Sequence, residues 1–382
     1  MHDVIIIGAG PTGSYTALQL AKEGFDVLVL EKNSSFVHPP VCTGIVSIEA
    51  FEEFNLPRDS ILSSIKDILF FSPSGQILPF RPNSTLAFVV DRFTFDQVLR
   101  ERAIKNGASI RLGAFCKEIQ IRDANVEIRV NDCREKIRAK TLVVASGFNR
   151  KLNESLGLGS PSDYLQGVQT EVKMEGIEET RIYIGNDIAP GSFAWIVGLE
   201  KGNARIGLTA KNHAPVFLQR FLRTPTLRDK IKDKGTILSK FIPVGNLRKT
   251  YSERMLVVGE AAGLLKTTTH GGIYYGLISS QLAVDTLKEA FRSGNFGSYT
   301  MKNYERRWKS ALNKELKAGH MIRRFFFNLH DGLIDKFFEI ALNNGVMDIV
   351  NKKFRFDWHS DLIFSLARHS LIKKYFSKLR YS

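Results

Sequence analysis

Three glycines near the start of the chain have the spacing of a nucleotide-binding turn, because Gly8, Gly10 and Gly13 form a Gly-x-Gly-x-x-Gly pattern. They follow the apolar run 4–7, typical of a strand buried on both faces, and precede a helical pattern. In such a unit the backbone approaches a pyrophosphate and the helix N-terminus favours an anion. The next apolar run ends in Glu31, where a carboxylate binds a ribose and disfavours a 2′-phosphate. The sequence therefore predicts a dinucleotide site made by Gly8, Gly10, Pro11, Thr12, Gly13, Glu31 and Lys32.

A second turn of small residues follows the apolar run 255–258, about 250 residues further along the chain. It begins at Gly259 and Glu260, and Gly271 and Gly272 then open a helical pattern. FAD is longer than NAD, so its flavin end must be held far from its adenosine end. A carboxylate suits ribityl hydroxyls better than phosphates, and the positive end of a helix suits the flavin edge. We therefore predict FAD as the cofactor, with Gly259, Glu260, Ala261, Gly271, Gly272 and Ile273 at its flavin half.

The sequence also limits the kinds of chemistry that can be expected. It contains no second Gly-x-Gly-x-x-Gly pattern that would form a separate NAD(P)H domain. An external electron donor, either NAD(P)H or a ferredoxin-like protein, is therefore expected. We find neither a metal-ligand spacing nor a Ser-His-Asp arrangement, and Lys266 is expected to be solvated.

Composition is ordinary for a globular protein, with 382 residues, 43% hydrophobic and 24% charged. The three cysteines, Cys42, Cys116 and Cys133, show no Cys-x-x-Cys spacing, which argues against a disulfide framework or a zinc site and favours a reducing compartment. The chain opens directly on a strand pattern, and no apolar run approaches the roughly 18–20 residues that cross a bilayer. A cytoplasmic protein without a signal peptide is the expectation.

Positive charge and aromatic residues gather at the C-terminus. Residues 301–382 hold 17 Lys or Arg against 8 Asp or Glu, and 14 of the 40 aromatic residues. This combination favours a phospholipid surface, with Lys352, Lys353, Lys373 and Lys374 at the headgroups, and peripheral contact with the inner face of the membrane. The alternative is that the aromatic runs 325–327 and 354–358 cover the core. We see no nucleic-acid-binding motif.

The order of helical and strand patterns predicts an α/β fold with three parts. Residues 1–65, 91–150 and 250–295 are expected to form a Rossmann-like FAD-binding domain. Residues 66–90 and 151–249 carry spaced strand patterns typical of an interleaved antiparallel sheet, which we expect to bind substrate. Residues 296–382 have apolar residues at helical spacing and form the predicted C-terminal helical, basic and aromatic region.

Several motifs resemble those of the FAD-dependent p-hydroxybenzoate hydroxylase superfamily, and within it the geranylgeranyl reductase family. The run Asp91–Asp96 with Leu99 is similar to the arginine motif of the superfamily, and residues 141–147 are similar to its returning strand. The run 266–276 resembles the reductase version of the second turn. The chain departs from the family pattern at Glu260, where Asp is usual, at Thr267, where Pro is common, and at His270, where Gly is usual. An aromatic element of the family is represented only by residues 193–198.

The resemblance implies an FAD-dependent reductase that saturates carbon–carbon double bonds of isoprenoid chains on lipid or prenyl substrates. The candidate catalytic residues are Cys42, Trp195 and Tyr274: the resemblance implies that Cys42 faces the reacting alkene, Trp195 is expected to line the substrate chamber with Phe193, and Tyr274 or Tyr275 is expected to project toward the flavin. The resemblance also implies that Cys42, Thr43, Gly44 and Arg92 lie near the flavin. The alternative interpretations are a small buried residue for Cys42 and a core aromatic for Trp195. His270 is expected either to donate a hydrogen bond to the flavin or substrate or to make a helix-terminus contact. Alternative functions are a lipophilic-substrate monooxygenase or epoxidase, a polyene cyclase or isomerase, and a flavoprotein without turnover that binds a membrane or nucleic acid.

Overall fold

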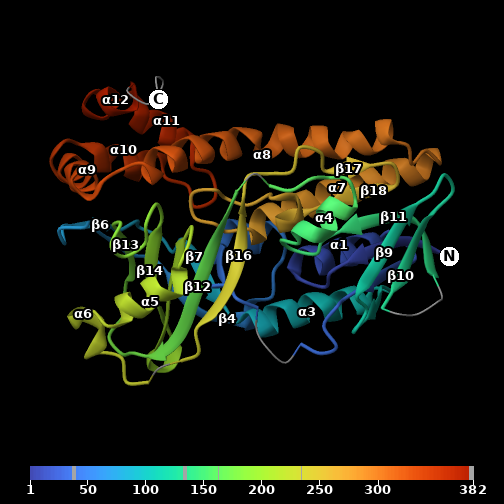
Figure 1. The fold of residues 1–382 in the computed structure, drawn as a ribbon, viewed down its shortest axis with the longest axis horizontal. Helices are drawn as coiled ribbons and strands as arrows, with labels where there is room; N and C mark the ends of the chain where they lie inside the picture. The colour runs from blue at the N-terminus through green and yellow to red at the C-terminus, as the bar shows by residue number, and fades with distance from the viewer. Residues whose placement is uncertain (37–39, 132–135, 162, 234, 378–382) are drawn as a thin grey trace.

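The computed structural model describes residues 1–36, 40–131, 136–161, 163–233 and 235–377, with side chains described up to residue 373. Two residues named above, Cys133 and the side chain of Lys374, lie outside this description. Three sheets and a long helical region make up the molecule (Figure 1). No helix in the described part of the chain combines the length and apolar character needed to cross a membrane.

A mostly parallel sheet forms the centre of the N-terminal part. Its strand order is β17-β18-β11-β1-β2-β8, and the antiparallel strands β10 and β9 continue from β11. The strands are β1 (His2–Ile7), β2 (Val27–Leu30), β8 (Ser109–Arg111), β9 (Cys116–Ile121), β10 (Val126–Val130), β11 (Lys136–Val144), β17 (Tyr251–Ser252) and β18 (Met255–Val257). The β1, β2 and β18 runs are apolar because helices cover the sheet, as expected for buried parallel strands.

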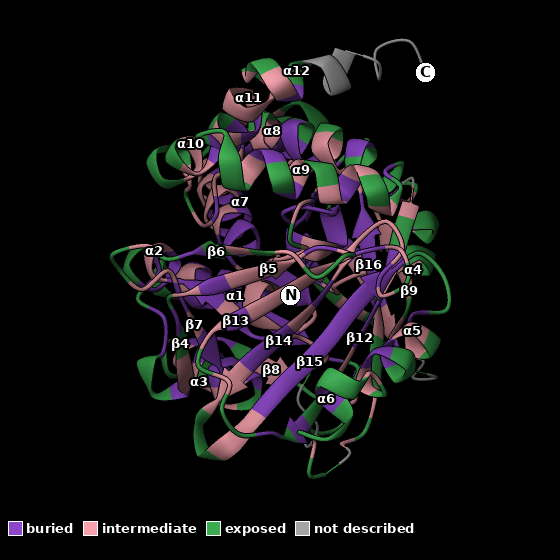
Figure 2. Ribbon diagram, turned by 90° about the vertical axis from the view of Figure 1, so that its left-hand side faces the viewer, coloured by how far each residue is buried: buried purple, intermediate pink, exposed green. Residues whose placement is uncertain are grey.

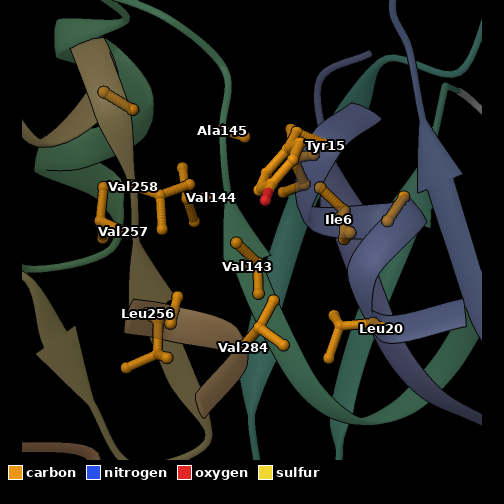
Figure 3. Packing of buried hydrophobic residues seen from close by; sticks show 14 of the residues in the cluster. Ile6, Tyr15, Leu20, Val143, Val144, Ala145, Leu256, Val257, Val258 and Val284 are labelled. Carbon is orange, nitrogen blue, oxygen red and sulfur yellow. The ribbon is translucent and has the colours of Figure 1, made fainter. Parts of the chain in front are cut away.

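Helices from distant parts of the chain pack on this sheet. Helix α1 (Pro11–Lys22) contacts both α3 (Arg92–Lys105) and α7 (Ile273–Ser293). Figure 3 shows the resulting core, in which side chains of β1, α1, β11, β18 and α7 meet: Ile6, Leu20, Val143, Leu256 and Val284. All five are at most 1% exposed, so this packing fixes α1 and α7 side by side.

The second sheet has seven strands in the order β16-β12-β15-β14-β13-β5-β6, antiparallel except for the β13–β5 pair. The strands are β5 (Ile68–Phe71), β6 (Ile77–Phe80), β12 (Asp163–Lys173), β13 (Thr180–Ile184), β14 (Phe193–Leu199), β15 (Asn203–Ala210) and β16 (Leu238–Val244). Helix α5 (Ala214–Leu222) covers one face, where Ile196, Ile206 and Leu208 are buried. Because side chains alternate along a strand, Phe193, Trp195 and Thr209 point to the opposite face.

A small sheet of β3 (Ile45–Ser47), β7 (Ala87–Val90) and β4 (Ile61–Ile65) connects the two larger ones. It joins strands from residues 1–65 to a strand from residues 66–90. The remaining short elements are α2 (Ile48–Glu53), η1 (Arg58–Ser60), α4 (Arg150–Ser155), η2 (Glu200–Gly202), α6 (Pro225–Arg228) and η3 (Gly259–Ala262).

The C-terminal region is helical. Helix α8 (Ser298–Phe327) spans 30 residues, about 45 Å at 1.5 Å per residue, and runs from α7 to the far end of the second sheet (Figure 1). It is followed by α9 (Asp331–Asn343), α10 (Val346–Lys353), α11 (Ser360–Arg368) and α12 (Ser370–Ser377). The predicted α/β class is confirmed, with a Rossmann-like sheet, an interleaved antiparallel sheet and a C-terminal helical region.

The aromatic run at the end of α8 has two faces. Phe325 is 4% exposed and packs with residues of β5 and β6, so it covers the core. Phe326 and Phe327 are 38% and 41% exposed. The exposed faces of α8 to α10 are visible in Figure 2. The core-cover interpretation therefore holds for Phe325, while Phe326 and Phe327 leave apolar surface exposed on another side of the helix.

Candidate functional site

The two glycine turns, far apart in the sequence, meet in the structure. A Cβ atom at Gly259 would lie 2.9 Å from Oγ1 of Thr12, and one at Gly276 would lie 2.6 Å from the same atom. The Ser280 hydroxyl on α7 donates to the carbonyl oxygen of Thr12 at 3.1 Å. Glycine is required at 259 and 276 because Thr12 leaves no room for a side chain. The first turn and the second turn therefore form one site.

The first turn is built by close backbone contacts. A Cβ atom at Gly13 would lie 1.9 Å from the carbonyl oxygen of Gly8, and Gly8 itself adopts a φ of +102°. By contrast, a Cβ atom at Gly10 would meet no described atom within 4 Å. Gly10 is the N-cap of α1, and no side chain caps that helix end. The open space at Gly10 and the free N–H groups of the helix match a bound pyrophosphate.

Glu31 lies at the carboxyl end of β2 and is 7% exposed. Its Oε2 accepts a hydrogen bond from the Ala9 amide at 2.9 Å, and its Oε1 accepts one from the Asn33 amide at 3.0 Å. These bonds hold the carboxylate beside the first turn. Lys32 is exposed. The open cradle, the helix N-terminus and the fixed carboxylate together fit the ADP half of FAD.

The second turn carries a carboxylate with a partner that the sequence did not suggest. Oε2 of Glu260 accepts a hydrogen bond from Nζ of Lys240 on β16 at 2.7 Å, and Oε1 accepts one from the Phe148 amide at 3.3 Å. The Ala261 carbonyl oxygen accepts a hydrogen bond from Asn153 at 2.9 Å. Gly272 is the N-cap of α7, without a side-chain cap. Glu260 is therefore held by charge and by backbone at the edge of the first sheet.

Cys42 lies beside a buried guanidinium. Arg92, 8% exposed, donates to both carboxylate oxygens of Asp96, at 2.8 and 2.9 Å. Burial alone would lower the pKa of Arg92, but the Asp96 carboxylate and the Cys42 thiol beside it raise that pKa above its ordinary value. The Cys42 Sγ atom also accepts a hydrogen bond from the Gly44 amide at 3.4 Å. The thiol is thus next to a fixed positive charge.

The second sheet contacts residues 42–44, which we call the Cys42 turn. Nε2 of Gln169 donates to the Cys42 carbonyl oxygen at 3.1 Å, and its Oε1 accepts from the Thr43 hydroxyl at 3.3 Å. Nη1 of Arg205 donates to the Thr43 carbonyl oxygen at 2.7 Å. Gly44 has a φ of +80° and a Cβ atom there would lie 2.5 Å from the Val90 carbonyl oxygen. The antiparallel sheet therefore positions this turn.

The same face of the sheet also contacts the second turn. His270, with a φ of +62°, stacks on Phe193 with ring centroids 5.6 Å apart and planes 3° from parallel. Its Nδ1 lies 3.5 Å from the Thr209 hydroxyl. Burial and the nearby Arg323 guanidinium lower the pKa of His270 to about 3, so the ring is neutral. The imidazole thus extends the aromatic wall made by the sheet.

Trp195 lies next to Phe193 on this wall, with ring centroids 5.8 Å apart. A Cβ atom at Gly207 would lie 2.4 Å from Cζ2 of Trp195, so the glycine makes room for the indole. The buried Nε1 of Trp195 has no hydrogen-bond partner among the described residues. We define the chamber face as the side of the second sheet that carries Phe193, Trp195, Gly207 and Thr209. It lies between the Cys42 turn and the second turn, which carries His270.

The other aromatic candidates point toward α2 and the C-terminus. The Tyr274 hydroxyl donates to Oε2 of Glu53 at 2.6 Å, and burial together with this hydrogen bond raises the pKa of Tyr274. The Tyr275 hydroxyl donates to the Asp357 carbonyl oxygen at 2.9 Å. Both tyrosines pack against Trp358. The structure therefore places Cys42 beside Arg92, and it places Trp195 against Gly207, the strand partner of Gln169, which contacts Cys42. The Tyr274 hydroxyl is tied to α2.

The expectation that Lys266 is solvated is wrong. Its Nζ atom lies 2.6 Å from Oδ1 of Asp357, and the two side chains are 7% and 2% exposed. Asp357 comes from the segment 354–360, which consists of the connection between α10 and α11 and the first residue of α11, and which contacts the second turn. A long-range contact across 91 residues buries this charge, and no local pattern could have indicated it.

The segment 354–360 also links to the second turn through His359. Nδ1 of His359 lies 2.7 Å from the Thr268 hydroxyl, and Nε2 lies 3.0 Å from the Phe356 carbonyl oxygen. Burial and the nearby Lys266 ammonium lower the pKa of His359 from 6.5 to about 4. The neutral ring therefore fits both contacts, with Nε2 donating and Nδ1 accepting.

We expect the free energy of unfolding to fall as the pH is lowered from about 6.5 to about 4. In this window the unfolded chain takes up a proton at His359 that the native chain refuses, so protons favour unfolding. Urea denaturation at pH 7, 6 and 5 measures the slope. His359→Gln should reduce the slope and leave the part due to His270 and His320, whose pKa values are also lowered, and His330→Gln, at an exposed position, should leave the slope unchanged. An equal slope in wild type and His359→Gln would contradict this assignment.

The described residues bring no three His, Cys, Asp or Glu side chains together as a group that could hold a metal ion. Sequence reasoning assigned no role in the site to five residues: Asp96, Gln169, Arg205, Thr209 and Lys240. A signal for Asp96 was available, because it lies four residues after Arg92 on one helix face. The other four depend on sheet register and had no local signal.

Known proteins resemble this chain over most of its length. A family model described as FAD dependent oxidoreductase matches residues 3–38. The digeranylgeranylglycerophospholipid reductase of Methanocaldococcus jannaschii is 30% identical, and the match covers 93% of this chain and 94% of that protein. The protein of the same name from Methanosarcina acetivorans is 28% identical, over 88% of this chain and 87% of that one.

Solved structures share the fold. A geranylgeranyl bacteriochlorophyll reductase-like protein from Thermoplasma acidophilum superposes with a TM-score of 0.87 at 22% identity, over 100% of this chain and 98% of that chain. The halogenase PltM in complex with phloroglucinol and FAD gives 0.70 at 16% identity, over 100% and 95%. At these identities the likeness concerns the fold.

Proposed function

We propose that this chain, which belongs to the digeranylgeranylglycerophospholipid reductase family and is an FAD-dependent oxidoreductase, saturates double bonds of lipid-borne isoprenoid chains. The reaction would take place between its Cys42 turn and its second turn. The observation that supports this place is the chamber face itself. One side of one sheet contacts the Cys42 turn through Gln169 and the second turn through Phe193 and Thr209. A substrate on this face would lie between both turns of the flavin half.

The residues around the two turns suit FAD. The open cradle at Gly10 and the N-terminus of α1 would hold the pyrophosphate, and Glu31 would bind the adenosine ribose. Glu260 would meet the ribityl hydroxyls, and the N-terminus of α7 at Gly271–Ile273 would face the flavin edge. Reduced FAD, when bound, supplies the hydride for reduction of a double bond.

The chain itself would exclude water and supply a proton. Phe193, Trp195 and the neutral His270 make an apolar wall that would orient a prenyl chain. We assign the proton to the thiol of Cys42, which would pass it from Sγ to the second alkene carbon. The Arg92 guanidinium beside Cys42 would then stabilise the thiolate until a proton from water restores the thiol.

The proposed reaction also involves a lipid surface and an external electron donor. The exposed aromatic side chains of α8 and the basic C-terminal region support peripheral contact with a lipid surface. Because no second dinucleotide pattern occurs in the sequence, NAD(P)H or a ferredoxin-like protein would deliver electrons from outside the two turns.

Cys42→Ala is expected to lower kcat/KM for a geranylgeranyl lipid by about 10²-fold, in line with loss of a positioned proton donor, while FAD stays bound. Single-turnover reoxidation of the reduced enzyme by substrate measures the rate. Cys116→Ala is the matched control, because Cys116 lies on β9, where burial raises its pKa to about 12, and should react at the wild-type rate. Equal rates for the Cys42 and Cys116 variants would remove Cys42 from the proposal.

A further inference from the structure

One end of the chamber face lies under the C-terminal part of α8. Strand β14 begins at Phe193, and in the antiparallel order its neighbour β15 ends at Ala210 and the next strand β12 begins at Asp163. All three positions therefore lie at the same end of the sheet. Phe327 of α8 closes on this end, because a Cβ atom at Gly191 would lie 2.4 Å from its ring.

Two cations at this end share one carboxylate. Nζ of Lys211, directly after β15, lies 3.4 Å from Oδ2 of Asp163. The Arg323 guanidinium of α8 lies close enough to Asp163 and to His270 for its charge to act on both. Among the described residues, no hydrogen bond or ion pair engages Arg323, although its side chain is half-buried. The two cations and one anion leave a net charge of +1.

The two histidines nearby are neutral and leave this charge unchanged. Burial, followed by the Arg323 charge, lowers the pKa of both His270 and His320. Burial also lowers the pKa of Arg323, and the Asp163 carboxylate offsets only part of that effect. A half-buried cation without a full counterion is costly, and an anionic ligand would remove that cost.

Apolar side chains surround these charges. Nζ of Lys211 lies 5.9 Å from the centre of the Phe327 ring. Phe326, Phe327 and Met321 of α8 are 38%, 41% and 39% exposed, and Lys211 is exposed as well. This end of the chamber face is therefore open to solvent, and it is both apolar and cationic. Such a combination fits an amphiphile with an anionic head and an apolar tail.

We propose that Arg323 and Lys211 form an anion subsite at the open end of the chamber face, which binds the phosphate of the lipid substrate's headgroup. From this point the prenyl chain would run along Phe193 and Trp195 toward Cys42. The inference rests on the proposed function, since it takes the chamber face as the place of the substrate. It names the feature by which the chain distinguishes a phospholipid from an uncharged prenyl compound.

Equilibrium binding to the oxidised, FAD-loaded full-length protein tests the subsite without turnover. The probes are geranylgeranyl monophosphate, geranylgeraniol and inorganic phosphate, measured by isothermal titration calorimetry. Arg323→Gln should weaken binding of the prenyl phosphate by about 10- to 100-fold, the range for a charge-assisted hydrogen bond, and leave geranylgeraniol unchanged. Arg324→Gln, the exposed neighbour on the same helix, should change neither affinity. Lys211→Gln should act in the same direction as Arg323→Gln and decides the matter if Arg323→Gln does not fold.

The outcomes separate the subsite from the function. Equal loss of both prenyl probes in Arg323→Gln, or no loss of either, would overturn the subsite. Binding of inorganic phosphate as tight as that of the prenyl phosphate would assign the site to a free phosphate and overturn the headgroup role. If the phosphate preference is observed but reduced enzyme adds no hydrogen to any prenyl lipid, the subsite stands and the proposed function fails.

Discussion

Gly13→Ala is expected to yield a protein that binds no FAD and loses about 3 kcal/mol or more of unfolding free energy. The added methyl group would lie 1.9 Å from the carbonyl oxygen of Gly8, within a turn that the β1–α1 packing holds rigidly. The backbone can accommodate it only by moving α1 away from β1, which opens the core and displaces the helix N-terminus. The flavin absorbance of the purified protein and its urea denaturation curve measure the two effects.

Two other glycine variants separate cofactor binding from folding. Gly10→Ala places its methyl group where no described atom lies within 4 Å, so the protein should fold with near wild-type stability and lose FAD affinity. Gly332→Ala lies at an exposed position of α9 and should retain FAD fully. A Gly13→Ala protein that keeps its flavin and its stability would contradict the described turn.

Lys266→Met is expected to lower the free energy of unfolding by about 3–5 kcal/mol, because it leaves the Asp357 carboxylate buried without its partner. The pair is almost fully buried, and Oδ2 of Asp357 already has no hydrogen-bond partner among the described residues. The segment 354–360 should detach first, since this pair and the contact between His359 and the Thr268 hydroxyl hold it on the second turn. Denaturant unfolding, together with proteolysis at that segment, measures the change.

An exposed pair provides the control. Lys314 and Asp361 lie 2.7 Å apart with 62% and 67% exposed side chains, so Lys314→Met should cost less than about 1 kcal/mol. Combining Lys266→Met with Asp357→Leu should recover part of the loss, because no charge then remains buried. Similar stabilities of the Lys266→Met and Lys314→Met proteins would show that the buried pair has no special role.

The first turn could be predicted because its chemistry is local. The strand, the glycines and Glu31 lie within about 30 residues, and each glycine has a nearby backbone reason, such as the Gly8–Gly13 approach. The second turn was recognisable by its small residues and by its resemblance to a family. Its meeting with the first turn depends on α1 and α7 packing side by side, which only the folded core determines.

The partners of the site were beyond the reach of sequence reasoning. Gln169 and Arg205 face the Cys42 turn because β12 and β15 pair in one particular register, and a shift of one residue would turn both away. Lys240 meets Glu260 only because β16 is the edge strand of the same sheet. The burial of Lys266 needs a segment from a third region of the chain. Such contacts follow from tertiary packing and leave no periodic trace.

The most direct test is the mass of the product. The FAD-loaded protein is reduced with dithionite without oxygen, a geranylgeranyl phospholipid is added, and the lipid is analysed by mass spectrometry while the flavin spectrum is followed. We predict a gain of 2 Da for each double bond reduced, in step with flavin reoxidation. An unchanged mass without oxygen, together with a gain of 16 Da and substrate-dependent oxygen uptake in air, would contradict the reductase and identify a monooxygenase.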